Sequence, residues 1–358
     1  MASNSIGNIF RLSTFGESHG SAIGGVIDGC PAGLSIDESC IQTQLERRKP
    51  GQSRISTQRK EEDKVKILSG IFEGLSTGSP IAFVIENTDQ RPKDYGHIQE
   101  SFRPSHADRT FQEKYGIRDH RGGGRSSARV TAPIVAAGAI ASQFLETQKV
   151  HVRAWVSRVH DIELTVEQDW TLEEIESNIV RCPHMATAQE MIGRIEAIKK
   201  EGDTVGGAIT CKAYGVTIGW GDPVFEKLNA NLAKALMGIN AVKGVEIGSG
   251  IPGTYRKGSE ENDLFTKKQG EIRTSSNNSG GIQGGISNGE EIIVKVSFKP
   301  VATIMQDQSS VDKDGLSTTV KGKGRHDPCV VPRAVPIVEA LVALVLADAS
   351  LMARSSRI

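Results

Sequence analysis

The stretch RGGGRSSAR, residues 121–129, concentrates arginine, serine and glycine in a single short segment. Guanidinium groups match the geometry of carboxylate and phosphate, serine adds hydroxyl and amide donors, and glycine lets the backbone approach a ligand closely. These residue types predict an anionic ligand. The stretch contains neither the P-loop pattern nor a dinucleotide-binding G-x-G-x-x-G after a strand. The structural alternative is a solvated turn.

Histidines and further arginines occur in other turn-rich segments. His19 lies in FGESHG and His106 in FRPSHAD, and either could act as an acid or base near neutral pH. A lone histidine is usually structural, but these two occur among many cations. The accompanying groups are Arg48 and Arg54 in RRKPGQSR, Arg103, Arg125, Arg129, and Arg325 with Asp327 in GRHDPC. We expect these loops to converge on one polyanionic small molecule, the alternative being scattered surface charge.

Composition gives no reason to expect nucleic acid or an anionic membrane as a partner, because 43 Lys and Arg balance 43 Asp and Glu. Five cysteines without a C-x-x-C pair favour a reducing compartment and no metal site. The beginning MASNSIGNIFR lacks the pattern of a secretory signal, so we expect a cytoplasmic protein. The most apolar segment, 335–349, predicts a buried helix and is too short to span a bilayer.

Strand-like segments occur in adjacent pairs. Residues 9–20 and 22–29 predict two strands around a turn that presents Glu17, Ser18 and His19, and residues 64–74 and 80–87 predict a hairpin. In 291–299, apolar residues alternate with polar ones and place Lys299 on the polar face. This order favours an α+β fold with antiparallel sheets over a doubly wound parallel sheet.

Helices are expected between these pairs. Residues 131–148 predict a closely packed helix whose N-terminus could attract an anion held by the preceding loop. Further helices are indicated by capping boxes at Thr171 with Glu174 and Thr187 with Glu190, and by an amphipathic pattern at 224–239. The charged segment 45–63 is expected at the surface, and 275–289 and 305–324 as long loops. We expect one domain over 1–358.

Eight motifs together resemble the chorismate synthase family over about residues 7–348, in this order: FGESHG, RRKPGQSR with TQRKEED, IENTDQR, FRPSHAD, RGGGRSSAR, NAVKGVEIG, NNSGGIQGGISNG and GRHDPCVVPRAVP. The resemblance implies one α+β domain with helices sandwiched between antiparallel β-sheets, a homotetramer and bound reduced FMN. It also implies a lyase that eliminates phosphate from 5-enolpyruvylshikimate 3-phosphate in a 1,4-anti sense. The product, chorismate, ends the shikimate pathway shared by aromatic amino acid biosynthesis.

The resemblance also implies roles for individual residues. His106 would give a proton to the departing phosphate, His19 would protonate or hydrogen-bond the reduced flavin, and Asp327, with Ser127 nearby, would relay a proton at the flavin. Substrate anions would be held by Arg48, Arg54, Arg103, Arg129 and Arg325, although Arg48 and Arg54 could instead bind a nicotinamide nucleotide such as NADP. Flavin contacts would come from Arg125, Ser126, Ser127, Asn240, Ala241, Gly284, Lys299, Pro300, Val301, Ala302, Thr303 and Arg325.

Two other functions fit parts of the sequence. A flavin reductase or another redox flavoprotein could use the same pocket, and an RNA-binding module could use the arginine- and glycine-rich loops. Zero net charge and 5% aromatic residues count against the RNA-binding module, because few rings are available to stack on bases. The source of electrons for the FMN stays open. The absence of an added reductase-like domain favours an external flavin reductase as a partner.

Overall fold

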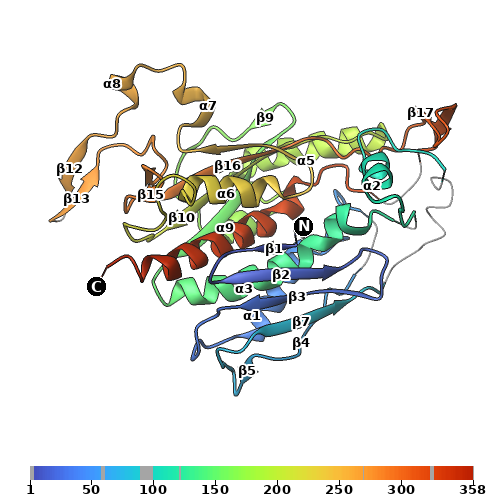
Figure 1. Cartoon of the computed structure of the whole chain (residues 1–358). Helices are drawn as coiled ribbons and strands as arrows, with labels where there is room; N and C mark the ends of the chain where they lie inside the picture. The colour runs from blue at the N-terminus through green and yellow to red at the C-terminus, as the bar shows by residue number, and fades with distance from the viewer. Residues whose placement is uncertain are drawn as a thin grey trace.

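Two antiparallel β-sheets enclose a layer of helices in the computed structural model, which describes residues 4–57, 61–88, 100–120, 122–268, 270–322 and 326–357 (Figure 1). Buried residues of both sheets and of the helices between them belong to one hydrophobic core cluster. The predicted α+β class with helices between antiparallel sheets is therefore confirmed.

The first sheet has five strands in the order β1 (Ser5–Ile6), β2 (Arg11–Gly16), β3 (Ala22–Asp28), β7 (Ile81–Glu86) and β4 (Val65–Ile67). Its neighbouring strands are all antiparallel. The strands β2 and β3 flank the predicted turn at 17–21. The predicted hairpin is β4 paired with β7, and a smaller hairpin of β5 (Ile71–Phe72) and β6 (Leu75–Ser76) is inserted between them.

The second sheet has five strands in the order β11 (Val242–Ile247), β16 (Ile292–Phe298), β10 (Gly207–Tyr214), β8 (His151–Val159) and β9 (Ile162–Glu163). In β16 the residues Val294, Val296 and Phe298 are buried and alternate with less buried ones. The predicted two-residue period is confirmed, and Lys299 follows directly where the strand ends.

The helical layer is built on α3 (Ala132–Glu146) and α9 (Val331–Ala353). These helices pack on each other, α3 against β2 and β3 and α9 against β8 and β10 (Figure 1). The helix α1 (Glu38–Arg48) packs on both, and α6 (Leu228–Met237) packs on α9. Because α3 and α9 have apolar neighbours on several sides, their sequences are apolar around most of the helix rather than along one stripe.

By length and composition, two helical segments in the described part of the chain could cross a membrane, Ala128–Glu146 and Val331–Ala353. Inside the fold, 78% and 94% of their most apolar windows are buried. The sequence prediction that the last helix is too short to span a bilayer was wrong, because the helix begins before residue 335 and ends after 349. The prediction that it is buried is confirmed.

The crossing of α3 and α9 depends on Gly138. A Cβ atom added there would lie 2.3 Å from Cβ and 2.4 Å from Cα of Ala340, so the helices could not keep their spacing. We expect Gly138→Ala to lower the free energy of unfolding by about 1–3 kcal/mol, as overpacking does. The measurement is urea unfolding of both proteins.

A matched control is Gly193→Ala in α5 (Met185–Lys200), because a Cβ atom at this exposed helical position would have nothing within 4 Å. Here the same substitution should raise the free energy of unfolding, by up to about 1 kcal/mol. Equal effects of the two substitutions would contradict the packing argument.

Several smaller elements differ from the sequence prediction. Thr171 caps α4 (Leu172–Glu176) with Glu174 as expected, but Thr187 lies inside α5, which begins after His184. The helix expected over 224–239 is the shorter α6. The segments expected as loops contain the hairpins β14 (Ile282–Gln283) with β15 (Ile286–Ser287) and β17 (Gln308–Val311) with β18 (Ser317–Val320).

The remaining described elements lie outside the central layers. They are α2 (Asp108–Tyr115), the 3-10 helices η2 (Gly124–Ser126) and η3 (Ala128–Thr131), α7 (Gly250–Gly253), α8 (Gly258–Glu261), and the hairpin of β12 (Phe265–Lys268) with β13 (Glu271–Thr274). The five cysteines are unpaired, and all except the half-buried Cys40 are buried. The four buried cysteines are small thiols of the protein interior.

Candidate functional site

A cavity of about 410 Å³ lies where the glycine-rich loop, the segment around His106, the end of β16 and the start of α9 meet. Much of the set predicted from the sequence lines it. These residues are Arg48, Arg103, Arg129, His106, Asp327, Ser126, Ser127, Asn240, Ala241, Lys299, Val301, Ala302 and Thr303. Segments far apart in the chain therefore converge on one cavity, as the sequence predicted.

Five predicted residues are not among the described residues that line this cavity: His19, Arg54, Arg125, Gly284 and Pro300. Arg54 is largely exposed and pairs with Glu196 on α5. Gly284 turns the β14–β15 hairpin, and Pro300 accepts a hydrogen bond from Lys299 at 3.2 Å. Arg325, predicted to bind both flavin and substrate, lies outside the described residues.

Arg125 lines a second cavity of about 910 Å³, which shares Ala107, Gly123 and Ser126 with the first. Its guanidinium donates to the Gly16 carbonyl at 3.0 Å, to Thr14 Oγ1 at 2.7 Å and to Asn4 Oδ1 at 2.9 Å. The predicted flavin ligand therefore fastens the glycine-rich loop to β2.

The glycine-rich loop lies close against His19. A Cβ atom on Gly122 would lie 2.0 Å from Nδ1 of His19, so only glycine allows this approach. The ring nitrogen is 2.9 Å from Ser18 Oγ. On the other side of the loop, the Asn240 side-chain amide donates to the Ser126 carbonyl at 2.7 Å. His19 thus packs against the glycine-rich loop and is not among the described residues that line the 410 Å³ cavity.

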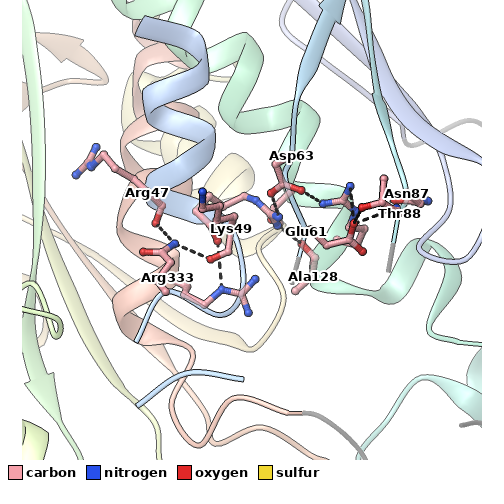
Figure 2. A network of polar contacts seen from close by, with 12 residues as sticks. Arg47, Lys49, Glu61, Asp63, Asn87, Thr88, Ala128 and Arg333 are labelled. Atoms are coloured by element: carbon pink, nitrogen blue, oxygen red, sulfur yellow. Dashed lines mark hydrogen bonds and ion pairs between the residues drawn. The ribbon is translucent and has the colours of Figure 1, made fainter. Parts of the chain in front are cut away.

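Buried ion pairs hold two of the cavity arginines (Figure 2). Asp63 accepts from Arg48 Nη2 at 2.5 Å and also pairs with Arg129. All three side chains are at most 3% exposed. Burial alone would raise the pKa of Asp63, but the charges and hydrogen bonds of the two arginines lower it to about 2. The carboxylate therefore fixes two guanidinium groups side by side at the cavity wall.

Arg129 is held by further polar groups. Its Nε donates to Asn87 Oδ1 at 2.8 Å, and Asn87 in turn donates to the carbonyls of Glu17 and Gly20 at 2.9 and 2.8 Å. Glu61 lies 4.0 Å from Arg129 and accepts from Thr88 at 3.1 Å (Figure 2). Asn87 thereby links the turn that carries His19 to an arginine of the cavity.

One buried donor in this network has no partner in the described structure. Arg48 Nε is buried without a hydrogen bond, although Nη1 donates to the Ala128 carbonyl and to Thr131 Oγ1 at 3.3 Å. An unsatisfied buried donor is costly, and Arg48 lines the cavity. The observation fits a residue that completes its hydrogen bonds when an anion enters.

His106, Arg103 and Asp108 form a compact cluster on another wall. Arg103 makes a two-pronged contact with Asp108, with Nε to Oδ2 and Nη2 to Oδ1 both at 2.8 Å. His106 Nδ1 lies 2.9 Å from Asp108 Oδ1. An acid or base is therefore placed directly beside an anion-binding group.

Asp327 is also paired. Arg333 binds one carboxylate oxygen, and the backbone amide of Thr57 donates to the other at 2.9 Å. Arg333 in turn donates from Nε to the Arg48 carbonyl at 3.2 Å, which joins the start of α9 to the end of α1 (Figure 2). Burial, together with nearby Lys243, lowers the pKa of Lys299. Its side chain adds to an electropositive wall suited to anions.

Three residues around this region adopt left-handed backbone conformations that side chains rarely take. Ser105 has φ of 55°, Ala241 has φ of 70° and Asp63 has φ of 51°. The first two line the cavity, and the third bonds its arginines. Strained residues persist where the surroundings over-determine them, which is common at functional sites.

Sequence reasoning missed the polar partners that hold the site residues. Asp63, Glu61, Asn87, Asp108 and Arg333 have no role in the prediction, although Asp108 belongs to FRPSHAD and Arg333 to GRHDPCVVPRAVP. The expectation that the segment 45–63 lies at the surface holds for Glu46, Arg54 and Glu62 and is wrong for Arg48, Ile55, Thr57, Glu61 and Asp63, which are buried, while 58–60 lie outside the described residues. The charges of Arg48, Glu61 and Asp63 compensate one another inside the protein. The zero net charge was the available signal, since an arginine-rich site needs buried counter-charges.

Comparisons with known proteins show which family the chain belongs to. The family model described as chorismate synthase matches residues 10–351. A chorismate synthase of Christiangramia forsetii is 58% identical over 359 residues, covering 100% of both chains. One of Cytophaga hutchinsonii is 56% identical over 358 residues, covering 99% of both. A chorismate synthase crystal structure has a TM-score of 0.77 and 31% identity, over 97% of this chain and 92% of the other. The chain therefore belongs to the chorismate synthase family.

Proposed function

We propose that this enzyme converts 5-enolpyruvylshikimate 3-phosphate to chorismate and inorganic phosphate with reduced FMN. The observation that carries the proposal is the single cavity in which Arg48, Arg103 and Arg129 converge with His106 and the expected flavin ligands. The substrate has two carboxylates and a phosphate ester, and FMN adds another phosphate. Desolvating so much negative charge requires fixed cations, and guanidinium forks suit these groups.

The described residues fit a flavin beside such a substrate. The cavity volume of about 410 Å³ is within the usual range for small-molecule sites, and the second cavity adjoins it through Ala107, Gly123 and Ser126. Ser126, Ser127, Asn240, Ala241, Lys299 and 301–303 would hold the FMN. The chemistry that a reduced FMN held there would supply is electron density for the allylic system as phosphate leaves, and an acceptor for the ring hydrogen.

The side chains of the chain bind, orient and move protons. Arg48, Arg103 and Arg129 would hold the carboxylates and the phosphate, with the free Nε of Arg48 gaining an acceptor. His106 would protonate the leaving phosphate oxygen. Asp327, oriented by Arg333 and near Ser127 at the same cavity, would take up or relay the proton at the flavin. His19 contacts the glycine-rich loop at Gly122, and its influence on the flavin would come from the position of that loop.

The rival function is redox chemistry by a flavin reductase. The ratio of chorismate formed to nicotinamide oxidised separates the lyase from the reductase. In an anaerobic mixture of enzyme, substrate and catalytic FMN that excess NADPH and an added flavin reductase keep reduced, elimination produces many chorismate molecules per nicotinamide oxidised, because the reaction has no net redox change. A reductase would oxidise one nicotinamide for each product molecule. A one-to-one ratio would overturn the proposal.

Assembly and electron supply are proposed on the same basis. A homotetramer in the cytoplasm, supplied with reduced flavin by an external reductase, fits the family. Light scattering of the purified protein tests the tetramer. Chorismate formation from oxidised FMN and NADPH without a reductase would show that the enzyme reduces its own flavin.

A further inference from the structure

Asp108 contacts both functional side chains of its wall without lining the 410 Å³ cavity itself. It is the first residue of α2 and is buried. Its Oδ2 accepts from the backbone amide and Nε of Arg103 at 3.1 and 2.8 Å, and its Oδ1 accepts from Nη2 of Arg103 at 2.8 Å. His106 Nδ1 and Arg118 Nη1 lie 2.9 and 3.2 Å from the same Oδ1. Toward the 410 Å³ cavity, Asp108 acts through these neighbours, and it also lines the adjoining 910 Å³ cavity.

At 2.9 Å, Nδ1 of His106 and Oδ1 of Asp108 form a hydrogen bond when one of the two atoms carries a proton. Burial would raise the pKa of Asp108, but hydrogen bonds and charges from Arg103 and His106 hold it well below its usual range. The carboxyl is therefore ionised and can only accept, so its hydrogen bond with the ring forms when Nδ1 carries the proton. Nε2 is then the ring nitrogen left for a ligand.

The charges around the ring make this carboxylate important. Arg103 Nη2 lies 3.0 Å from the same Nδ1. A guanidinium can only donate, so this contact favours Nδ1 without a proton and opposes a positive charge on the imidazole, whereas the anionic Asp108 favours the proton on Nδ1. The other titratable and charged groups among the described residues of the cavity are Arg48, Arg129, Lys299, His326, Asp327 and Arg333. Most of these are cations, and Asp327 is already paired with Arg333. Asp108 therefore supplies the negative charge next to an imidazolium at this position.

We propose that Asp108 is a positioning residue, which holds His106 as the Nδ1–H tautomer, directs Nε2 to the phosphate of the substrate and fixes Arg103 with the same carboxylate. The inference rests on the proposed function of His106. In that step, the Nε2–H bond breaks as an O–H bond forms on the phosphate. The C–O electron pair leaves with the phosphate, and the neutral imidazole keeps its Nδ1 proton bonded to Asp108.

The tautomer can be measured without turnover. In protein labelled with ¹⁵N-histidine, assigned with His106→Gln, we expect His106 in the neutral state to show a protonated Nδ1, and Asp108→Asn to remove this preference. Asp161→Asn is the matched control, because Asp161 bonds the surface His160 at 2.7 Å. It should leave the His106 signals unchanged. A wild-type His106 protonated at Nε2, or a tautomer unaffected by Asp108→Asn, would overturn the inference.

Kinetics separate positioning from a structural role. We expect Asp108→Asn to lower kcat about tenfold or more and to move the basic limb of the pH–rate profile to lower pH, because the imidazolium loses its counter-charge. Asp108→Glu should restore part of kcat. In a His106→Gln background, Asp108→Asn should leave kcat unchanged, while the rise in KM caused by the freed Arg103 should persist.

A lower melting temperature with wild-type kcat and pH profile would make Asp108 merely structural. The same conclusion would follow if Asp108→Asn lowered kcat as strongly in the His106→Gln background as in the wild type. If His106→Gln itself keeps wild-type turnover, the proposed function of His106 fails, whereas the ¹⁵N measurement still decides the tautomer that Asp108 sets.

Discussion

Replacing His106 by alanine is expected to lower turnover by about 10²-fold or more, because the leaving phosphate loses its general acid. The side chain is 20% exposed, lines the cavity beside Arg103 and is not part of the core, so the fold should remain intact. The measurement is kcat with saturating reduced FMN under anaerobic conditions, together with the melting temperature.

The control for this substitution is His160→Ala. His160 also contacts an aspartate, at 2.7 Å, but its side chain is 49% exposed on the surface. Its replacement should change neither kcat nor the melting temperature measurably. Unchanged turnover in His106→Ala would remove this residue from the proton-transfer step.

Asp63→Asn is expected to lower the free energy of unfolding by about 3–5 kcal/mol, because two buried guanidinium groups lose their shared counter-charge. Both carboxylate oxygens of Asp63 form ion pairs, one with Arg48 and the other with Arg129. An amide of the same size keeps the shape and removes the charge. Chemical denaturation at pH 7 measures the loss.

The control is Asp169→Asn, at a carboxylate that bonds Lys212 at 2.8 Å with its side chain 61% exposed. An exposed ion pair contributes about 0–1 kcal/mol, so this variant should unfold almost as the wild type does. Similar losses in the two variants would contradict the importance of burial.

The Asp63 carboxylate also predicts how the free energy of unfolding depends on pH. The pKa of Asp63 in the folded protein is about 2, below the value of about 3.9 expected when unfolded. A carboxyl group whose pKa is depressed in the folded protein stabilises the fold at pH values above its unfolded pKa. This stabilisation is lost as the pH falls from about 5 toward 2. At about 1.4 kcal/mol per pKa unit, this stabilisation amounts to about 2.5 kcal/mol. Asp63→Asn should show a correspondingly flatter decline in this range, and an unchanged slope would contradict the shift.

Local patterns predicted the elements well wherever one signal dominated. Alternation gave β16, the small apolar residues gave α3, and the capping box at Thr171 gave α4. The second box failed because the helix had already begun at Met185, so Thr187 and Glu190 are interior residues. A capping pattern indicates a helix start only where no preceding turn is helical.

The site was predictable in its cations and unpredictable in its pairings. Arg48 and Arg129 are at the cavity as expected, but the partner that fixes both, Asp63, is recognised only when three distant segments meet. Arg54 carries the same signal as Arg48 and is instead turned toward Glu196 on α5. Residue type indicates what a side chain can bind, whereas the fold decides whether it faces the ligand.

The most direct test of the account is an anaerobic assay with reduced FMN and 5-enolpyruvylshikimate 3-phosphate that follows chorismate absorbance and released phosphate together. Parallel mixtures contain oxidised FMN or no flavin. The account predicts equal amounts of chorismate and phosphate over many turnovers, dependent on reduced FMN. Absence of both products from a folded, FMN-bound enzyme would contradict it, as would phosphate release without chorismate.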